Sequence, residues 1–231
     1  MDLSEEMKMN KTIHYFGDSH TAGIGEVNPN PLEPGIYYHI PFRKYLDDLL
    51  GIPNVNHSFG GKNFMLNVRD VFSNLHTFKK GDIVLFQTQF FCNSILKYGD
   101  FDFVVSSGRF DSNQIYKNDE LDINEGDSIT LLNWTIKFEE RRSLYDLNIL
   151  IDTFKYLRTQ GINTYLLYWT RAYDIELPNN ELVLTFDGNP YVCDGDVPTI
   201  TKATNGAWKD EHTTNEFNEE LANKIYKIIN G

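Results

Sequence analysis

The sequence predicts an α/β domain built around a parallel β-sheet. Short apolar segments typical of strands alternate along the chain with segments whose apolar residues recur at helical spacing. One strand segment, GDIVLFQT, is almost continuously apolar, as expected in a sheet that helices cover on both faces. The chain has 231 residues, enough for one such domain with a sizeable core. Because it contains neither an internal repeat nor a linker, we expect a single domain over residues 1–231.

The first half of the chain predicts three strands and two helices in alternation. The first strand is expected at 13–16, and FRKYLDDLLG follows as a helix that Gly51 ends. A second strand is expected in NVNHS (54–58), then a helix over 67–78 and a third strand in GDIVLFQT (81–88). The apolar positions predicted to face inward on these two helices are Phe42, Tyr45, Leu46, Leu49, Leu50, Val68, Val71, Phe72 and Leu75.

The region from Cys92 to Arg142 interrupts this alternation. Its segment ITLLNWTIKF predicts a strand, with alternate apolar residues on one side: Leu132, Trp134, Ile136 and Phe138. We interpret residues 92–142 as an insertion or lid beside the carboxyl edge of the sheet. A helix is then expected over 144–158, with Leu144, Leu147, Ile151 and Phe154 on one face, followed by Gly161, a fourth strand in INTYLLYW and a last helix over 213–229.

Charge and cysteine content exclude several classes of function. The formal net charge is −12, which argues against binding to a nucleic-acid backbone or to an anionic membrane surface. It suits a neutral or cationic substrate, or serves solubility alone. Cys92 and Cys193 are the only cysteines, and they form neither a disulfide framework nor a metal-binding pattern. We predict no metal and no cofactor.

Targeting signals are absent from the sequence as given. No run of about 18 apolar residues is present, so no membrane span is expected. The segment MDLSEEMKMNKT lacks the apolar core of a signal peptide. The expected location is therefore the cytoplasm by default, and the oligomeric state stays open.

The stretch YFGDSHTAG contains the first candidate functional residue, Ser19, directly after the first strand. Ligands of open parallel sheets bind beyond the carboxyl ends of the strands, where Ser19 is expected. Gly-Asp-Ser is also a common turn sequence, so a plain turn is the alternative. A serine nucleophile needs a base, usually a histidine that a carboxylate orients.

His212 is the best candidate base among the six histidines. It lies in WKDEHTTNEF with Asp210 two residues earlier, where a solvated helix N-terminus is the alternative interpretation. The remaining histidines fit less well: His14 and His76 are expected to be structural, His20 to point away from the site, and His39 and His57 to lie in loops.

Three blocks of the sequence resemble those of the SGNH, or GDSL-like, hydrolases. FGDSHT resembles the first block, and VNHSFGGKN the second, with Asn56 and Gly61 at its characteristic positions. DEHTTNEFNEELA resembles the last block, including its His-to-Ala spacing. The resemblance implies a three-layer, flavodoxin-like, doubly wound fold and a serine esterase mechanism. It also implies Ser19 as nucleophile, His212 as base and Asp210 as its orienter, with the backbone N–H groups of Ser19 and Gly61 binding the oxyanion.

Two departures from the family pattern bear on the chemistry. One residue, rather than the usual two, separates Asp210 from His212; this spacing resembles related branches that include alginate-type O-acetyltransferases. The third block, normally Gly-x-Asn-Asp, is replaced by FQTQFFCNS, with Phe91 at the place of the oxyanion asparagine. Gln89 or Asn93 is the candidate replacement donor, or neither contributes; Gln87 is instead a candidate for buried support below the site.

Aromatic residues near the expected site suggest the substrate. Tyr37 and Tyr38 lie in the proline-rich loop EVNPNPLEPGIYYHI, and Trp169 and Trp208 lie on segments expected at the same edge. Aromatic faces suit sugar rings, so we expect an O-acetyl ester of a carbohydrate, with core or lid packing as the alternative role of these rings. Three functions remain: an esterase for small acyl esters, an O-acyltransferase acting on a sugar, and a non-catalytic carbohydrate-binding or structural module.

Overall fold

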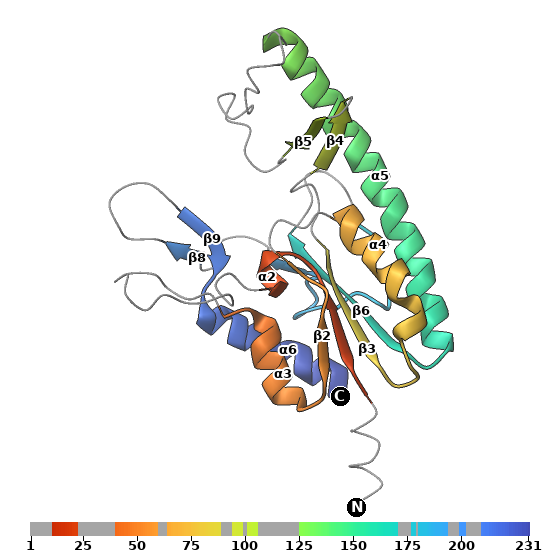
Figure 1. The fold of residues 1–231 in the computed structure, drawn as a ribbon. Coiled ribbons are helices and arrows are strands. Elements are labelled where there is room, and N and C mark those ends of the chain that lie inside the picture. Colours follow the sequence, from red (N-terminus) through yellow and green to blue (C-terminus); the bar gives the residue numbers. More distant parts are fainter. Residues whose placement is uncertain are drawn as a thin grey trace, which may run out of the picture.

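A five-stranded, entirely parallel β-sheet forms the centre of the computed structural model (Figure 1). The predicted α/β class is thereby confirmed. The structure describes residues 11–22, 40–59, 64–88, 94–98, 101–105, 125–170, 177–178, 180–193, 199–201 and 209–231. Of these, residues 94–98, 101–105, 125–140, 170, 193, 199–201 and 209–212 are described by their backbone.

The elements follow the alternation expected from the sequence. The strands of the central sheet are β1 (Ile13–Phe16), β2 (Asn54–Asn56), β3 (Ile83–Thr88), β6 (Asn163–Thr170) and β7 (Tyr191–Cys193). The helices are α2 (Ser19–Ala22), α3 (Phe42–Leu50), α4 (Phe64–Asn74), the 3₁₀ turn η1 (Leu75–Thr77), α5 (Glu125–Thr159) and α6 (Asn215–Asn230). Two antiparallel pairs complete the elements in the described residues: β4 (Ser94–Tyr98) with β5 (Phe101–Val105), and β8 (Thr199–Thr201) with β9 (Lys209–Thr213).

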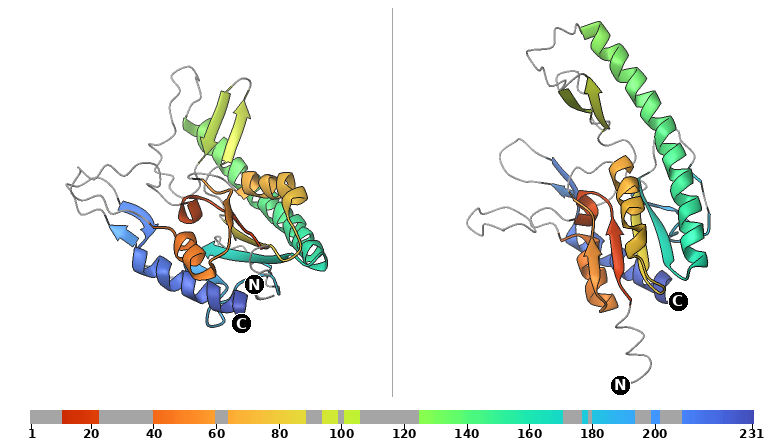
Figure 2. Two further views of the ribbon diagram at one scale, coloured as in Figure 1. Left: turned by 60° about the horizontal axis from the view of Figure 1, so that its bottom comes forward. Right: turned by 45° about the vertical axis from the view of Figure 1, so that its right-hand side comes forward.

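Helices cover the sheet on both faces, so the domain has three layers (Figure 2). On one face, α4 and α5 pack over a core that includes Phe16, Phe86 and Phe154. On the other face, α3 and α6 enclose a core that includes Tyr15 and Leu85. Every residue of β3 is buried, as the apolar run GDIVLFQT predicted. The three layers explain why β3 is apolar at successive positions, because the side chains on both of its faces pack against helices.

The strand order places a topological switch point between β1 and β3. The order is β2-β1-β3-β6-β7, which becomes 2-1-3-4-5 when only these five strands are counted, as in flavodoxin-like doubly wound folds. From β1 the chain passes to β2 on one side, and the next strand, β3, pairs on the other side of β1. The crevice beyond the carboxyl ends of β1 and β3 is therefore where this kind of sheet binds ligands.

Residues 129–138 are helical, which corrects the predicted strand. They belong to α5, which runs without a break into the helix expected at 144–158. The segment between Phe138 and Leu144 contains neither glycine nor proline, so helix propagation costs less than ending one element and starting another. Within 92–142, β4 and β5 form a hairpin apart from the central sheet, and α5 begins at the same end of the molecule (Figure 1).

Smaller differences concern helix ends and helix faces. The helix predicted over 67–78 is α4 with η1 after it, and the last helix begins at Asn215, after the N-cap Thr214. Leu49 and Phe72 were expected to face inward but are 38% and 37% exposed, because they lie at the margins of their apolar stripes. Gly51 and Gly161 end their helices with positive φ angles of 60° and 78°, as their positions predicted.

Candidate active site

Ser19 is the first residue of α2, a single helical turn that follows β1 at the switch point. Asp18 builds this turn. Its backbone carbonyl accepts hydrogen bonds from the N–H groups of Thr21 (3.1 Å) and Ala22 (2.7 Å), and its Oδ1 accepts one from the N–H of His20 (2.9 Å). Asp18 is 1% exposed, whereas Ser19 is half-buried and its hydroxyl makes no hydrogen bond to another described residue. Gly-Asp-Ser therefore forms a turn, and Ser19 lies in that turn at the carboxyl edge of the sheet.

Gly17 allows α2 to pack closely against β3. A Cβ atom at Gly17 would lie 2.7 Å from Oε1 of Gln87 and 2.8 Å from Cβ of Thr21. The Thr21 hydroxyl donates a hydrogen bond to this same Oε1, and both side chains are 1% exposed. Gln87 is thus buried beneath the turn, in the supporting position for which it was a candidate.

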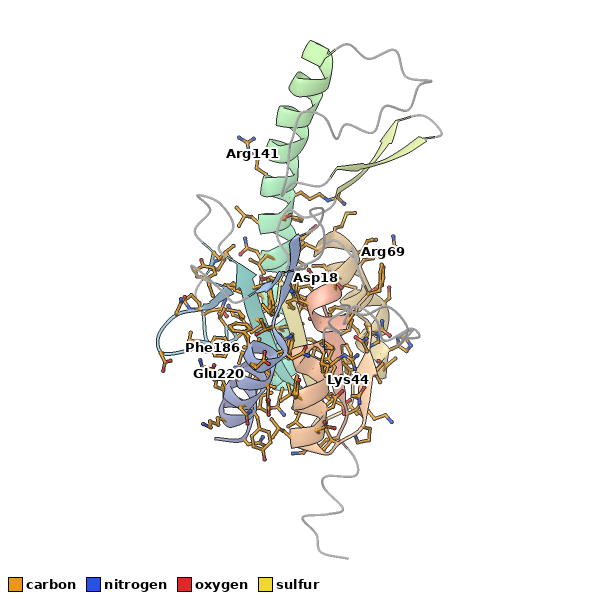
Figure 3. The ribbon with its side chains drawn as sticks, turned by 90° about the vertical axis from the view of Figure 1, so that its left-hand side faces the viewer. Asp18, Lys44, Arg69, Arg141, Phe186 and Glu220 are labelled. Atoms are coloured by element: carbon orange, nitrogen blue, oxygen red, sulfur yellow. The ribbon has the colours of Figure 1, made fainter. Side chains whose placement is uncertain are left out.

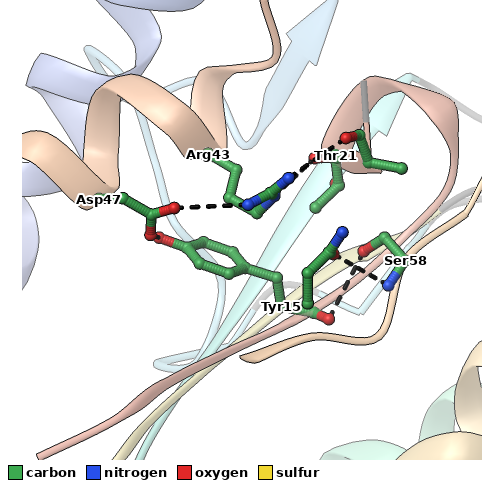
Figure 4. A network of polar contacts seen from close by, with 7 residues as sticks. Tyr15, Thr21, Arg43, Asp47 and Ser58 are labelled. Carbon is green, nitrogen blue, oxygen red and sulfur yellow. Dashed lines mark hydrogen bonds and ion pairs between the residues drawn. The ribbon is translucent and has the colours of Figure 1, made fainter. Parts of the chain in front are cut away.

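A buried guanidinium holds the other end of α2 (Figure 4). Arg43 of α3 donates from Nε to the carbonyl of Thr21 (3.2 Å) and from Nη2 to the carbonyl of Ala22 (3.3 Å). These carbonyls end the helix and have no partner within it, so the cation satisfies them. Arg43 is 3% exposed, and its charge is balanced by Asp47, with Nη1 and Oδ2 3.4 Å apart.

Tyr15 completes this network from β1. Its hydroxyl donates to Oδ1 of Asp47 over 2.8 Å. Burial raises the pKa of Tyr15 well above its ordinary value, and the Asp47 carboxylate adds to that effect. Burial also raises the pKa of Asp47, although its hydrogen bond from Tyr15 and the charge of Arg43 oppose the rise. The network links β1, α2 and α3 below the turn that carries Ser19.

Asn56 shapes the segment after β2. Its Oδ1 accepts a hydrogen bond from the N–H of Ser58 (3.0 Å), and the Ser58 hydroxyl lies 3.5 Å from the carbonyl oxygen of Tyr15. The N–H of His57 donates to the same carbonyl (2.9 Å). These bonds attach the start of the second block to β1. Its Gly61 lies outside the described residues.

Asp210 and His212 lie on the strand β9, directly before the last helix, and not within the first turn of that helix. The end of β9 is tied to the segment before α3: Thr213 Oγ1 donates to Asn218 Oδ1 (2.7 Å), and Asn218 Nδ2 donates to the carbonyl of Ile40 (2.9 Å). The N–H of Ile40 in turn donates to Oδ1 of Asn215 (2.9 Å). Since α3 also holds α2 through Arg43, the first and last blocks meet at one end of the sheet, where Figure 3 shows β9 beside α2 and Asp18.

Trp169 packs in the core. Its side chain is 5% exposed; its ring centroid lies 4.5 Å from that of His20 and 6.1 Å from that of Phe42. This is the packing role left open for the aromatic residues. The same contact places the His20 ring against Trp169, near the carboxyl end of β6.

His14 lies in a buried polar group below the site. Its Nδ1 is 3.4 Å from Nε2 of His57, and its Nε2 is 3.6 Å from Oδ2 of Asp82. Asp82 also accepts hydrogen bonds from the N–H groups of Thr12 (2.9 Å) and Lys79 (2.7 Å). Burial lowers the pKa of His14, and Asp82 opposes this only in part. His14 is thus structural, as predicted.

Other predicted site residues lie outside the described residues: Gln89, Asn93, Phe91, Tyr37, Tyr38 and Trp208. Conversely, the sequence did not single out the supporting residues Arg43, Asp47, Tyr15 and Thr21. The one available signal was the i,i+4 spacing of Arg43 and Asp47, which is typical of a surface helix pair.

Comparisons with known proteins assign no family. No model of a known protein family matches the chain, and no curated protein shows significant similarity to it. Within the described part of the chain, no three His, Cys, Asp or Glu side chains gather as a metal site would require. No helix there is both long enough and apolar enough to cross a membrane.

Proposed function

We propose that the protein is a serine esterase of the SGNH/GDSL-like type that cleaves small acyl esters. One observation carries the proposal: Ser19 begins α2 at the switch point between β1 and β3, and β9, which carries Asp210 and His212, ends beside α2, where Asn218 ties Thr213 to the segment before α3 (Figure 3). Such an edge is where enzymes on this kind of sheet bind substrates. Ser19 is half-buried and its turn is anchored by Arg43 and Gln87, an arrangement that suits a nucleophile.

The proposed reaction has two halves. His212 takes the proton of the Ser19 hydroxyl as its oxygen attacks the acyl carbonyl carbon, and Asp210 stabilises the resulting imidazolium. Backbone N–H groups of Ser19 and Gly61 stabilise the negatively charged oxygen. The imidazolium then protonates the departing alcohol and leaves an acyl-serine. Water attacks this ester, His212 again accepts and returns the proton, and the carboxylic acid departs.

An O-acetylated carbohydrate is the proposed substrate class. Trp169 packs in the core, so the aromatic platform for a sugar ring is assigned to Tyr37, Tyr38 and Trp208. Because Phe91 cannot donate a hydrogen bond, the third oxyanion donor is assigned to Gln89 or, as the alternative, Asn93. The spacing of Asp210 and His212 resembles that of alginate-type O-acetyltransferases, and this resemblance supports acyl transfer as a second candidate, in which a sugar hydroxyl replaces water in the second half-reaction.

Hydrolysis of p-nitrophenyl acetate by the full chain and its Ser19→Ala variant tests the proposal. We expect the variant to lower kcat by about 10³-fold or more, because the triad acts as a unit. A fluorophosphonate probe should label the wild type and not the variant. Ser73→Ala is the matched control, since Ser73 lies on the exposed side of α4, where its hydroxyl donates to the carbonyl of Arg69.

The outcomes separate the candidate functions. Equal labelling of wild type and Ser19→Ala would contradict the esterase and favour a non-catalytic module. An acetylated sugar product that forms only when an acceptor sugar is added would identify the transferase. Near-wild-type kcat in both Gln89→Ala and Asn93→Ala would leave only the two backbone donors.

A further inference from the structure

Gln87 is a buried amide in a strand that is otherwise apolar up to that point. Residues 83–86 of β3 are Ile, Val, Leu and Phe, and Gln87 is 1% exposed. Its Oε1 accepts a hydrogen bond from Thr21, whereas its Nε2 is buried and has no hydrogen-bond partner among the described residues. A buried donor without a partner lowers stability, so stability alone does not explain a glutamine here.

The turn that Gln87 contacts cannot hold its own shape. α2 has four residues, and one isolated helical turn is unstable in water. Its geometry therefore depends on contacts from neighbouring elements. Thr21, two residues after Ser19, makes two of these contacts. Its carbonyl accepts a hydrogen bond from Arg43 of α3, and its hydroxyl donates one to Gln87 of β3. Gly17 provides the space in which the second contact forms.

We propose that Gln87 is a positioning residue for Ser19, acting through the hydroxyl of Thr21. The hydrogen bond fixes α2 against the carboxyl end of β3 and so fixes the place of the serine at the sheet edge. The kinetic part of this inference rests on the proposed esterase function, whereas the anchoring of α2 does not. A misplacement of a reacting group by about 1 Å costs on the order of 10²-fold in rate.

Two single variants and their combination test the contact. Gln87→Met keeps the length of the side chain without its acceptor, and Thr21→Val keeps the shape of threonine without its donor. The variant Thr21→Ser retains the hydroxyl and should restore activity. The double variant Thr21→Val/Gln87→Met replaces both polar groups by apolar groups of similar shape. Stability should then stay nearly unaltered, because neither partner is left buried without the other.

Thr164→Val is the control. It removes a buried hydrogen bond from the Thr164 hydroxyl to the carbonyl of Phe154, at the opposite end of the sheet.

Three measurements on the full chain distinguish positioning from general support. We expect Gln87→Met and Thr21→Val each to lower kcat for p-nitrophenyl acetate by 10- to 100-fold with KM unchanged, because neither side chain touches substrate. The pH profile of kcat should keep its form. The double variant should lose no more than either single variant and should keep its unfolding temperature, since the two residues act through one contact.

Hydrogen exchange provides a readout that needs no esterase activity. The amides of Thr21 and Ala22, which bond to the Asp18 carbonyl, should exchange at least tenfold faster in both single variants and at the wild-type rate in Thr164→Val. If the wild type hydrolyses no ester but exchange accelerates as stated, the esterase proposal fails and the anchoring role stands. Unchanged exchange in Gln87→Met and Thr21→Val would overturn the anchoring role, whatever the kinetics. An equal fall in kcat in Thr164→Val would also overturn it.

Discussion

The guanidinium of Arg43, on α3, donates a hydrogen bond of 3.2 Å from Nε to the backbone carbonyl of Thr21, in the turn that carries Ser19. A second donor of the same group reaches the carbonyl of Ala22, and a third faces Asp47. The arginine is therefore a buried cation with partners on two elements. Removing it takes the donor from two carbonyls and the opposite charge from the largely buried Asp47 carboxylate, to which the Tyr15 hydroxyl still donates.

Arg43→Met should lower the free energy of unfolding by about 3 kcal/mol or more, because breaking a buried ion pair leaves its partner uncompensated. Urea unfolding of the purified chain measures this loss. Lys44→Met removes the neighbouring exposed charge of the same helix and should change stability by about 0.5 kcal/mol or less. Equal effects of the two substitutions would show that Arg43 is not the anchor described.

Gly17→Ala should lower both stability and activity. The added Cβ would approach Gln87 Oε1 and Thr21 Cβ within 2.8 Å, so α2 must move away from β3. Overpacking of this kind costs about 1–3 kcal/mol. Gly188→Ala is the comparison: with φ of 83° and open space around its Cβ, it should cost about 1–2 kcal/mol while kcat stays unchanged. Wild-type kcat in Gly17→Ala would contradict the need for close packing under Ser19.

The free energy of unfolding should fall as the pH is lowered below about 6.5, in part because of His14. Burial holds its folded-state pKa below the ordinary value of 6.5, so the unfolded chain binds a proton first as the pH falls. The contribution of His14 to the free energy of unfolding is fully present above pH 6.5. Below that pH it declines, by at most about 1.4 kcal/mol per pH unit. His14→Gln, compared with the wild type by urea unfolding between pH 5 and 8, should show a shallower decline below pH 6.5. Parallel curves would assign the decline to other groups.

Asp210→Asn should lower kcat by on the order of 10³-fold and leave the unfolding temperature unchanged, because the amide no longer stabilises the His212 imidazolium. Asp152→Asn, at an exposed position of α5, is the control and should retain wild-type kcat. Retained activity in Asp210→Asn, with loss in Asp187→Asn, Asp194→Asn or Asp196→Asn, would move the role to another carboxylate.

Local patterns in the sequence predicted the elements that depend on neighbouring residues. The apolar run ending at Thr88 predicted β3, and the stripe through Leu147, Ile151 and Phe154 predicted the buried face of α5. Residues 129–138 show where such patterns fail: their apolar positions fit both a period of two and helical spacing, and only the continuation into α5 decides between them.

By itself, the sequence determined the parallel α/β class, the place of Ser19 after the first strand and the candidate partners Asp210 and His212. The tertiary structure decided what surrounds the serine: the order of the strands, the burial of Trp169 and Arg43, and the bond between Thr21 and Gln87. The physical reason is separation along the chain. Thr21 and Gln87 are 66 positions apart, and a polar side chain becomes a buried anchor only when folding brings its partner to it and removes water from both.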